Sequence, residues 1–150
     1  MKYAHLIKLT AFSYEHENTE NVTNAFLDFF PFDLDKHKIH LKITNATGFA
    51  DNTIKILEAT LSKDALINEF LQNLLGKLDD GQKKEILDQA ESRLDSNLDF
   101  FLRFDKELWI DGRKLELTDS GKCFHLKISI AAFPKKREVA LNIVKELFSK

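Results

Sequence analysis

Cysteine is almost absent from this chain of 150 residues, which contains only Cys123. A single cysteine cannot form a disulfide within the chain, and we therefore expect a protein of a reducing compartment. Cys123 opens an apolar stretch, so we expect a core residue rather than a nucleophile. A chain of this length buries about two thirds of its unfolded surface and needs no disulfide to fold.

Glycine and proline are also scarce, with five and two residues. Most of the chain should therefore be regular structure. No apolar run approaches about 18 residues, so we expect no segment that spans a membrane. The opening stretch, MKYAHLIKLTAF, is too short and too polar for a signal peptide, and we expect a cytoplasmic protein.

The short motifs of common enzyme classes are missing. There is no Gly-x-Ser-x-Gly, Walker loop, Rossmann glycine pattern or Cys-x-x-Cys. The five histidines predict no metal site, because His37 and His40 have opposite parity on one predicted strand and point to opposite faces. We expect no catalytic residue, metal or cofactor. An unrecognised enzyme would need a pocket that holds His40 or His125 with a carboxylate.

The chain is rich in phenylalanine, with thirteen residues, in a composition that is 43% hydrophobic and 31% charged. This composition is typical of a globular protein. The length is that of one ordinary domain, which we assign to residues 1–150. Alternating apolar residues predict strands at residues 2–14, 37–46, 53–61, 98–104, 114–118 and 123–132.

Helical spacing of apolar residues predicts four helices between these strands. The second is the longest, and Ser62 or Asp64 is expected to cap it. Asp79 and Gln82 have the spacing of a capping box for the third. Pro134 takes the first position of the last helix. The helices cover residues 19–30, 64–78, 80–94 and 134–148.

Charged residues interrupt the strand pattern after Phe104, in the stretch DKELWIDG. One interpretation is that Asp105 caps a single helical turn that ends before Gly112, with Trp109 anchored in the core. The other is a hairpin that turns at Asp111-Gly112. An ion pair of Arg103 with Asp105 would add only about 0–1 kcal/mol at the surface. We therefore assign Asp105 to a cap and keep Arg103 as a candidate binding residue.

The order of elements mixes helices with strands that are apolar on one face only. A sheet covered on both faces would have continuously apolar strands instead. We predict an α+β fold: a two-layer sandwich whose mostly antiparallel sheet carries helices on one face and is open to water on the other.

The open face collects most of the candidate binding residues. In the predicted strand 37–46, for example, Ile39, Leu41 and Ile43 face in while the basic residues face out. Basic side chains around an exposed aromatic ring suit an RNA backbone with a base stacked on the ring. The alternative is that any exposed sheet face is polar. The face presents Lys8, Lys38, His40, Lys42, Phe101, Arg103, His125 and Lys127.

Charge is unevenly distributed along the chain. Residues 58–99 contain five Lys or Arg against ten Asp or Glu, whereas residues 122–150 contain seven against two. Three of the cations, Lys135, Lys136 and Arg137, are placed in the first turn of the predicted last helix. Cations are unfavourable there by about 0.3–1 kcal/mol each, so the cluster indicates a phosphate site at the helix start or, alternatively, a solvated basic turn.

Three motifs carry a family resemblance that spans most of the chain: GFADNTI at residues 48–54, LRFDK at 102–106 with Gly112 following, and FPKKRE at 133–138. In these motifs the chain resembles an archaeal family, domain of unknown function fifty-four, described as RNA-binding or exosome-associated. It departs from the family pattern at Asp51 and Thr53, where a glycine and a proline are expected.

The resemblance implies the fold of the ribosomal protein that binds 5S rRNA, and an RNA-related role in the archaeal cytoplasm. It also implies that Asn52, Arg103 and Lys106 contact RNA. Our leading hypothesis is an RNA-binding accessory protein that is not an enzyme, with Phe101 or Phe49 stacked on a base. The alternative is a protein-interaction or homo-oligomeric subunit, which would use the acidic region at residues 58–99 or pair two open faces.

Overall fold

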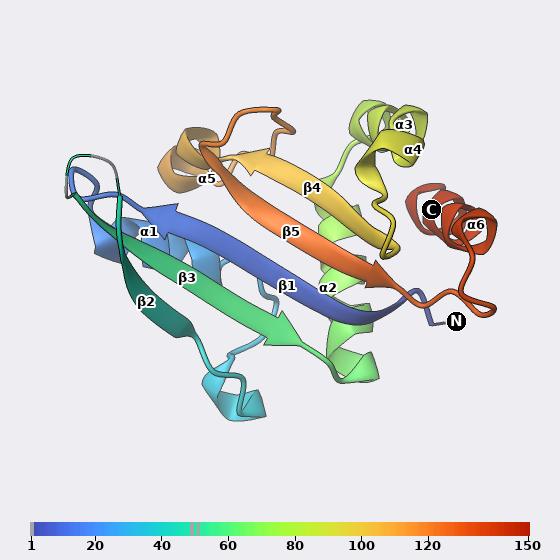
Figure 1. Cartoon of the computed structure of the whole chain (residues 1–150), viewed down its shortest axis with the longest axis horizontal. Helices are drawn as coiled ribbons and strands as arrows, with labels where there is room; N and C mark the ends of the chain where they lie inside the picture. Colours follow the sequence, from blue (N-terminus) through green and yellow to red (C-terminus); the bar gives the residue numbers. More distant parts are fainter. Residues whose placement is uncertain (1, 49, 51) are drawn as a thin grey trace. The chain divides into compact units, whose positions relative to one another are not determined.

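A computed structural model describes residues 2–48, 50 and 52–150. Its strands form a five-stranded sheet in the order β2-β3-β1-β5-β4. Neighbouring strands point in opposite directions and α1 lies behind β1 and β3 (Figure 1). The predicted α+β fold with an open, antiparallel sheet is confirmed. The strands are β1 Ala4–Ser13, β2 Lys42–Thr47, β3 Thr53–Leu61, β4 Asp99–Asp105 and β5 Cys123–Ile130.

Helices fill most of the connections between these strands. None in the described part of the chain is long and apolar enough to cross a membrane. The helices are α1 Thr19–Leu27, the 3-10 helix η1 Asp35–His37, α2 Asp64–Lys77, α3 Asp80–Asp88, α4 Ala90–Arg93, α5 Lys106–Gly112 and α6 Arg137–Phe148.

The chain divides into two compact units, and β1, β4 and β5 contribute residues to both. Unit 1 comprises Met1–Ile7, Leu61–Leu102 and Leu126–Lys150, and unit 2 comprises Lys8–Thr60 and Arg103–His125. The single domain assigned to residues 1–150 stays a prediction.

In unit 2 the core is a cluster of aromatic rings between α1, α5 and the strands. The Phe29 ring lies 4.4 Å from Trp109, 5.1 Å from Phe124 and 5.9 Å from Phe104, measured between centroids. Trp109 is 2% exposed and its Nε1 donates a hydrogen bond of 2.7 Å to the Ala25 carbonyl. The indole therefore buries a large apolar surface with its one polar group satisfied, and its predicted anchoring role is confirmed.

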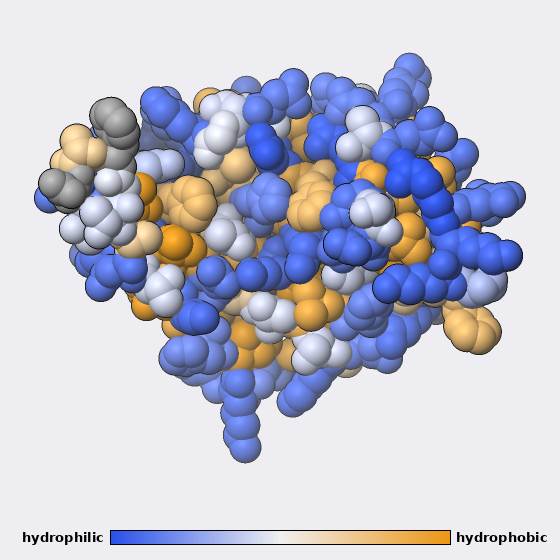
Figure 2. Space-filling model, in the orientation of Figure 1, coloured by the Kyte–Doolittle hydropathy of each residue, from blue (hydrophilic) through white to orange (hydrophobic). Residues whose placement is uncertain are grey.

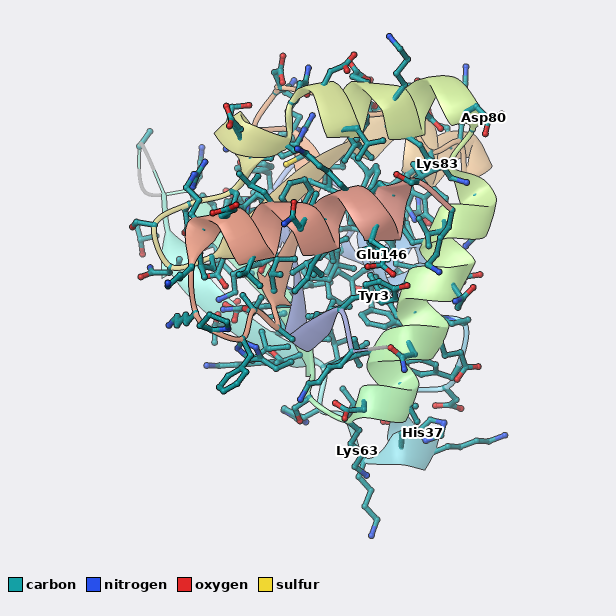
Figure 3. The ribbon with its side chains drawn as sticks, turned by 90° about the vertical axis from the view of Figure 1, so that its right-hand side faces the viewer. Tyr3, His37, Lys63, Asp80, Lys83 and Glu146 are labelled. Atoms are coloured by element: carbon teal, nitrogen blue, oxygen red, sulfur yellow. The ribbon has the colours of Figure 1, made fainter. Side chains whose placement is uncertain are left out.

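In unit 1, helix α6 packs against helix α3 and strand β4. Phe148 of α6 packs on Phe100 of β4 with ring centroids 5.8 Å apart. Lys83 Nζ donates a hydrogen bond of 2.7 Å to the Lys150 carbonyl, and Lys150 Nζ lies 5.5 Å above the Tyr3 ring. The side chains of Tyr3 and Lys83 accordingly lie near the same end of α6 (Figure 3).

Two predicted caps are confirmed. The Asp79 carboxylate accepts from the Gln82 backbone N–H at 2.7 Å, and the Gln82 side chain accepts from the Asp79 N–H at 3.0 Å, so the capping box is complete. The Asp105 carboxylate accepts from the Leu108 N–H at 3.0 Å and starts α5. Because Lys106–Gly112 form the helix α5, the helical interpretation of this stretch holds and the hairpin does not, although the helix includes Gly112 instead of ending before it.

The predicted strand at residues 37–46 is wrong in its first half. Lys38 has a left-handed backbone (φ 58°) that ends η1, so extended structure begins only at Lys42. Ile43 pairs directly with the buried Leu57 and therefore shares its face. It is nevertheless 48% exposed, because β2 is the edge strand and has a neighbour on one side only.

Three other local predictions are wrong. The N-cap of α2 is Lys63, and neither Ser62 nor Asp64 caps it. Pro134 precedes α6, which starts at Arg137. At residues 114–118 the structure has only an isolated bridge, between Leu117 and Phe104, rather than a strand.

Candidate nucleic-acid interface

The open face of unit 2 contains a hollow of about 300 Å³. In the unit 2 part of β1, Lys8, Thr10 and Phe12 alternate with the buried Leu9 and Ala11 and point toward this face. Figure 2 shows hydrophobic atoms exposed between hydrophilic ones on the side of the strands that is turned to the viewer. We call this the first hollow; its lining includes Thr10, Phe12, Arg103, Cys123 and His125.

Phe12 is the aromatic side chain of the first hollow and is 41% exposed. Sequence reasoning missed it and chose Phe101, which is half-buried in unit 1. The signal was available, because Phe12 has the same strand parity as Lys8, which was assigned to the open side.

Arg103 supplies the cation of the first hollow, as predicted for the open face. The side chain is exposed, and its Nη1 donates a hydrogen bond of 3.3 Å to the Asp119 carbonyl. This bond uses one of the five N–H donors of a guanidinium. Beside it, burial raises the pKa of the Cys123 thiol, although the positive charges of Arg103 and Lys106 oppose that rise.

A second hollow, of about 500 Å³, lies at the end of β1 and includes a residue that the family motif pointed to. Asn52 lines it together with Tyr14, Glu15, His16 and Ile54. Tyr14 and His16 are stacked, with centroids 6.0 Å apart and planes inclined by 16°.

Phe12 joins the two hollows through its contact with Tyr14. The two rings meet edge-on, with centroids 6.4 Å apart. Phe12, Tyr14 and His16 therefore form one line of rings, which we call the aromatic row.

Lys106 was predicted to contact RNA, but the structure places it beneath this surface. It is 4% exposed, and its Nζ donates to Glu17 Oε1 at 2.6 Å and to the Phe12 carbonyl. The same ammonium lies 4.9 Å from the centroid of the Tyr14 ring. A lysine held in this way fixes the backbone and one ring of the aromatic row instead of reaching a ligand.

The contact with Lys106 affects the pKa of the Glu17 carboxylate. Burial by itself would raise the pKa of Glu17. The hydrogen bonds from Lys106 Nζ and the Tyr14 backbone N–H, with the charges of Lys106 and His16, outweigh that effect and hold the pKa below its usual value. The ion pair is therefore formed at neutral pH.

The other predicted residues of unit 2 are not part of either hollow. Lys8 pairs with Glu58 at 3.1 Å across the open side. Lys38, His40 and Lys42 are exposed; Lys38 and His40 lie between η1 and β2, whereas Lys42 is the first residue of β2 and pairs with Glu58. Phe49, named as a second stacking candidate, lies outside the described residues.

In unit 1 the predicted residues are half-buried or engaged. Phe101 and Lys127 are partly covered on β4 and β5. Arg137 donates to the Leu94 carbonyl at 3.0 Å and the Glu91 carbonyl at 2.5 Å, at the C-terminal end of α4. The exposed Lys135 and Lys136 precede α6. The predicted cluster of three cations in one helical turn is therefore wrong, because only Arg137 belongs to the helix.

Among residues 2–48, 50 and 52–150, no group of three His, Cys, Asp or Glu side chains is placed to hold a metal ion. The open face of unit 2 instead has the exposed ring of Phe12 and the guanidinium of Arg103 in one hollow. Aromatic rings and cations of this kind bind the bases and phosphates of single-stranded nucleic acids.

A family model described as RNA binding matches residues 6–130. The chain belongs to this RNA-binding family. It is 28% identical over 143 residues to the RNA-binding protein PAB1135 of Pyrococcus abyssi, covering 95% of this chain and 92% of that protein.

Solved structures agree with this assignment. The crystal structure of the DUF54 protein AF2318 from Archaeoglobus fulgidus matches with a TM-score of 0.85 and 29% identity over 96% of this chain and 99% of that one. Mth689 of Methanothermobacter thermautotrophicus, a DUF54 protein, matches with a TM-score of 0.77 and 28% identity over 97% and 98%. The resemblance seen in the sequence motifs is therefore confirmed.

Proposed function

We propose that this chain binds single-stranded RNA through the first hollow of unit 2. The observation that carries the proposal is the exposed Phe12 ring beside the Arg103 guanidinium in one hollow. An unpaired base can stack on the ring while the guanidinium binds a neighbouring phosphate. The hollow has a volume in the range of small-ligand sites.

Membership of an RNA-binding family supports RNA as the ligand. Phosphate contacts spread over a wider surface add affinity without sequence information. Within unit 2 we assign such contacts to the exposed Lys38, His40 and Lys42; within unit 1, considered by itself, we assign phosphate contacts to Lys127, Lys135 and Lys136.

Binding rather than catalysis is the function that the first hollow favours. Stacking of a base and binding of a phosphate need an exposed ring and a cation, and Phe12 and Arg103 provide both in the first hollow. These two groups support a binding role.

For its setting, we propose an accessory protein of RNA processing or degradation in the cytoplasm, working with an assembly such as the exosome. The family resemblance supports this setting. Affinity purification from a native extract after nuclease treatment tests it, because a retained protein partner would show an assembly that does not depend on RNA.

Fluorescence anisotropy with a labelled single-stranded RNA at two salt concentrations tests RNA binding itself. We expect saturable binding that weakens with salt, because phosphate neutralisation releases counterions. Phe12→Ala should weaken binding about tenfold through the lost stacking. Arg103→Gln should reduce the slope of log affinity against log salt by about one.

Matched variants control for general effects of substitution. Ile43→Ala also removes an exposed apolar side chain, 48% exposed against 41% for Phe12, but on the face shared with Leu57. Lys55→Gln removes an exposed cation of β3 outside both hollows. Both should bind RNA like the wild type. Absence of saturable binding at low salt would refute the proposal.

A further inference from the structure

The aromatic row leads from the first hollow into the second. Phe12 lines the first hollow, whereas Tyr14 and His16 line the second. We propose that the second hollow receives the base of an adjacent nucleotide and that Asn52 reads its edge with a preference for adenine. The ligand is then an extended single strand with at least two neighbouring unpaired bases. This inference rests on the proposed function and specifies its ligand.

The lining of the second hollow suits a base and not a phosphate. Ile54 and the stacked rings of Tyr14 and His16 provide apolar and π surfaces. Glu15, which is exposed in the same hollow, carries a carboxylate that repels phosphate. A neutral, flat group meets no such repulsion and gains stacking energy.

The ring spacing selects unpaired, splayed bases. The centroids of Phe12 in the first hollow and Tyr14 in the second are 6.4 Å apart. Nucleotides in a stacked strand rise about 3.4 Å each, so neighbouring stacked bases cannot each meet their own ring. A strand whose bases are pulled apart can, and this is the form in which single-stranded RNA is recognised.

The row is held in place before any ligand arrives. Lys106 Nζ binds the Phe12 carbonyl and Glu17 Oε1, and the Tyr14 backbone N–H donates to that same carboxylate oxygen at 3.0 Å. A preformed surface loses less conformational entropy on binding. The Phe12 and Tyr14 part of the row is therefore held by contacts within unit 2 and not by the ligand.

Asn52 is positioned by the connection from β2 to β3. Its carbonyl accepts a hydrogen bond of 2.7 Å from the Gly48 N–H. A Cβ at Gly48 would lie 2.5 Å from Ile54 Cδ1, so the glycine allows its backbone to approach the lining residue Ile54. An asparagine amide offers a donor beside an acceptor, which matches the N7 acceptor and N6 donor of adenine.

The test is competition anisotropy, in which unlabelled oligoadenylate and oligouridylate of equal length displace a labelled single strand. The wild type should bind oligoadenylate about tenfold more tightly. Asn52→Ala should abolish this preference while salt-dependent binding remains. Asn45→Ala, an exposed asparagine of β2 outside the second hollow, should keep it. His16→Ala should weaken binding of both strands about fivefold, whereas the exposed His5→Ala should not.

The outcomes separate this inference from the function on which it rests. If RNA binding depends on Phe12 but the wild type shows no adenine preference, or Asn52→Ala retains it, the second-hollow assignment is wrong and the first-hollow function stands. If no strand binds at low salt, both are wrong. Because His16 and Asn52 are exposed, a thermal melt should show that the variants fold like the wild type.

Discussion

Lys106 and Glu17, which are 89 residues apart in the sequence, form an ion pair of 2.6 Å beneath the aromatic row. Lys106→Met keeps the length of the side chain but removes the charge. It removes the ammonium that donates to the Phe12 carbonyl and to Glu17 Oε1, an oxygen that then keeps the Tyr14 N–H. We expect the free energy of unfolding to fall by about 2–4 kcal/mol, measured by urea denaturation with the single Trp109 as the fluorophore.

Lys114→Met is the control for this change. Its side chain is 66% exposed and forms a long surface pair of 3.7 Å with Glu116. The unfolding free energy of that variant should stay within about 0.5 kcal/mol of the wild type. Equal stability of the two variants would mean that the Lys106–Glu17 pair does not hold this segment.

The lowered pKa of Glu17 predicts a specific pH dependence of stability. The folded pKa lies below the unfolded value of about 4.3, so the folded protein binds fewer protons in this range and stability rises with pH there. The stabilisation is present above the unfolded pKa and is lost as the pH falls through the folded one.

Urea titrations of the wild type and Glu17→Gln over a series of pH values measure this effect. The difference in unfolding free energy should be largest near neutral pH and shrink as the pH falls below about 4.3. A difference that stays constant through the acid range would show that the charge of Glu17 contributes nothing.

Cys123, the only cysteine of the chain, reports on the first hollow. Because burial raises the pKa of its thiol, alkylation near neutral pH should be slower than for a free cysteine. Saturating single-stranded RNA should slow it further by covering the hollow. Mass spectrometry of timed iodoacetamide reactions measures both rates. If the rate with RNA matches the rate without it, the ligand does not occupy the first hollow.

The features that the sequence predicted correctly depend on residues that are close together in the chain. The Asp79–Gln82 capping box and the Asp105 cap involve residues three apart, and both form as expected. The alternation along β4, along β1 from Ile7 onward and along most of β5 correctly separated buried from more open positions, whereas His5 is exposed and Ser129 is buried, against the pattern. These features depend on contacts within one turn or one strand, which residue spacing encodes directly.

Errors arose where tertiary contacts decide the outcome. Lys106 was predicted to be a surface cation. It is buried because it bonds Glu17 and the Phe12 carbonyl, which are distant in the sequence. Alternating apolar and polar residues predicted a strand at residues 37–46. Because Lys38 has a left-handed backbone, β2 begins only at Lys42. Asn52 was pointed to by the family motif alone, because neither periodicity nor composition reveals that it shares a hollow with Tyr14.

Arg137 was predicted to contact a ligand, but in the structure it bonds other residues of the chain, and this structural role can be tested. Its guanidinium donates to the carbonyls of Glu91 and Leu94 at the end of α4. Arg137→Ala leaves these helix-terminal carbonyls without that partner, so the unfolding free energy should fall by about 1–2 kcal/mol. Lys136→Ala, an exposed cation one position earlier, should change stability by less than about 0.5 kcal/mol. If both variants unfold like the wild type while RNA affinity falls equally in both, the original assignment of the three cations to a phosphate site is the better one.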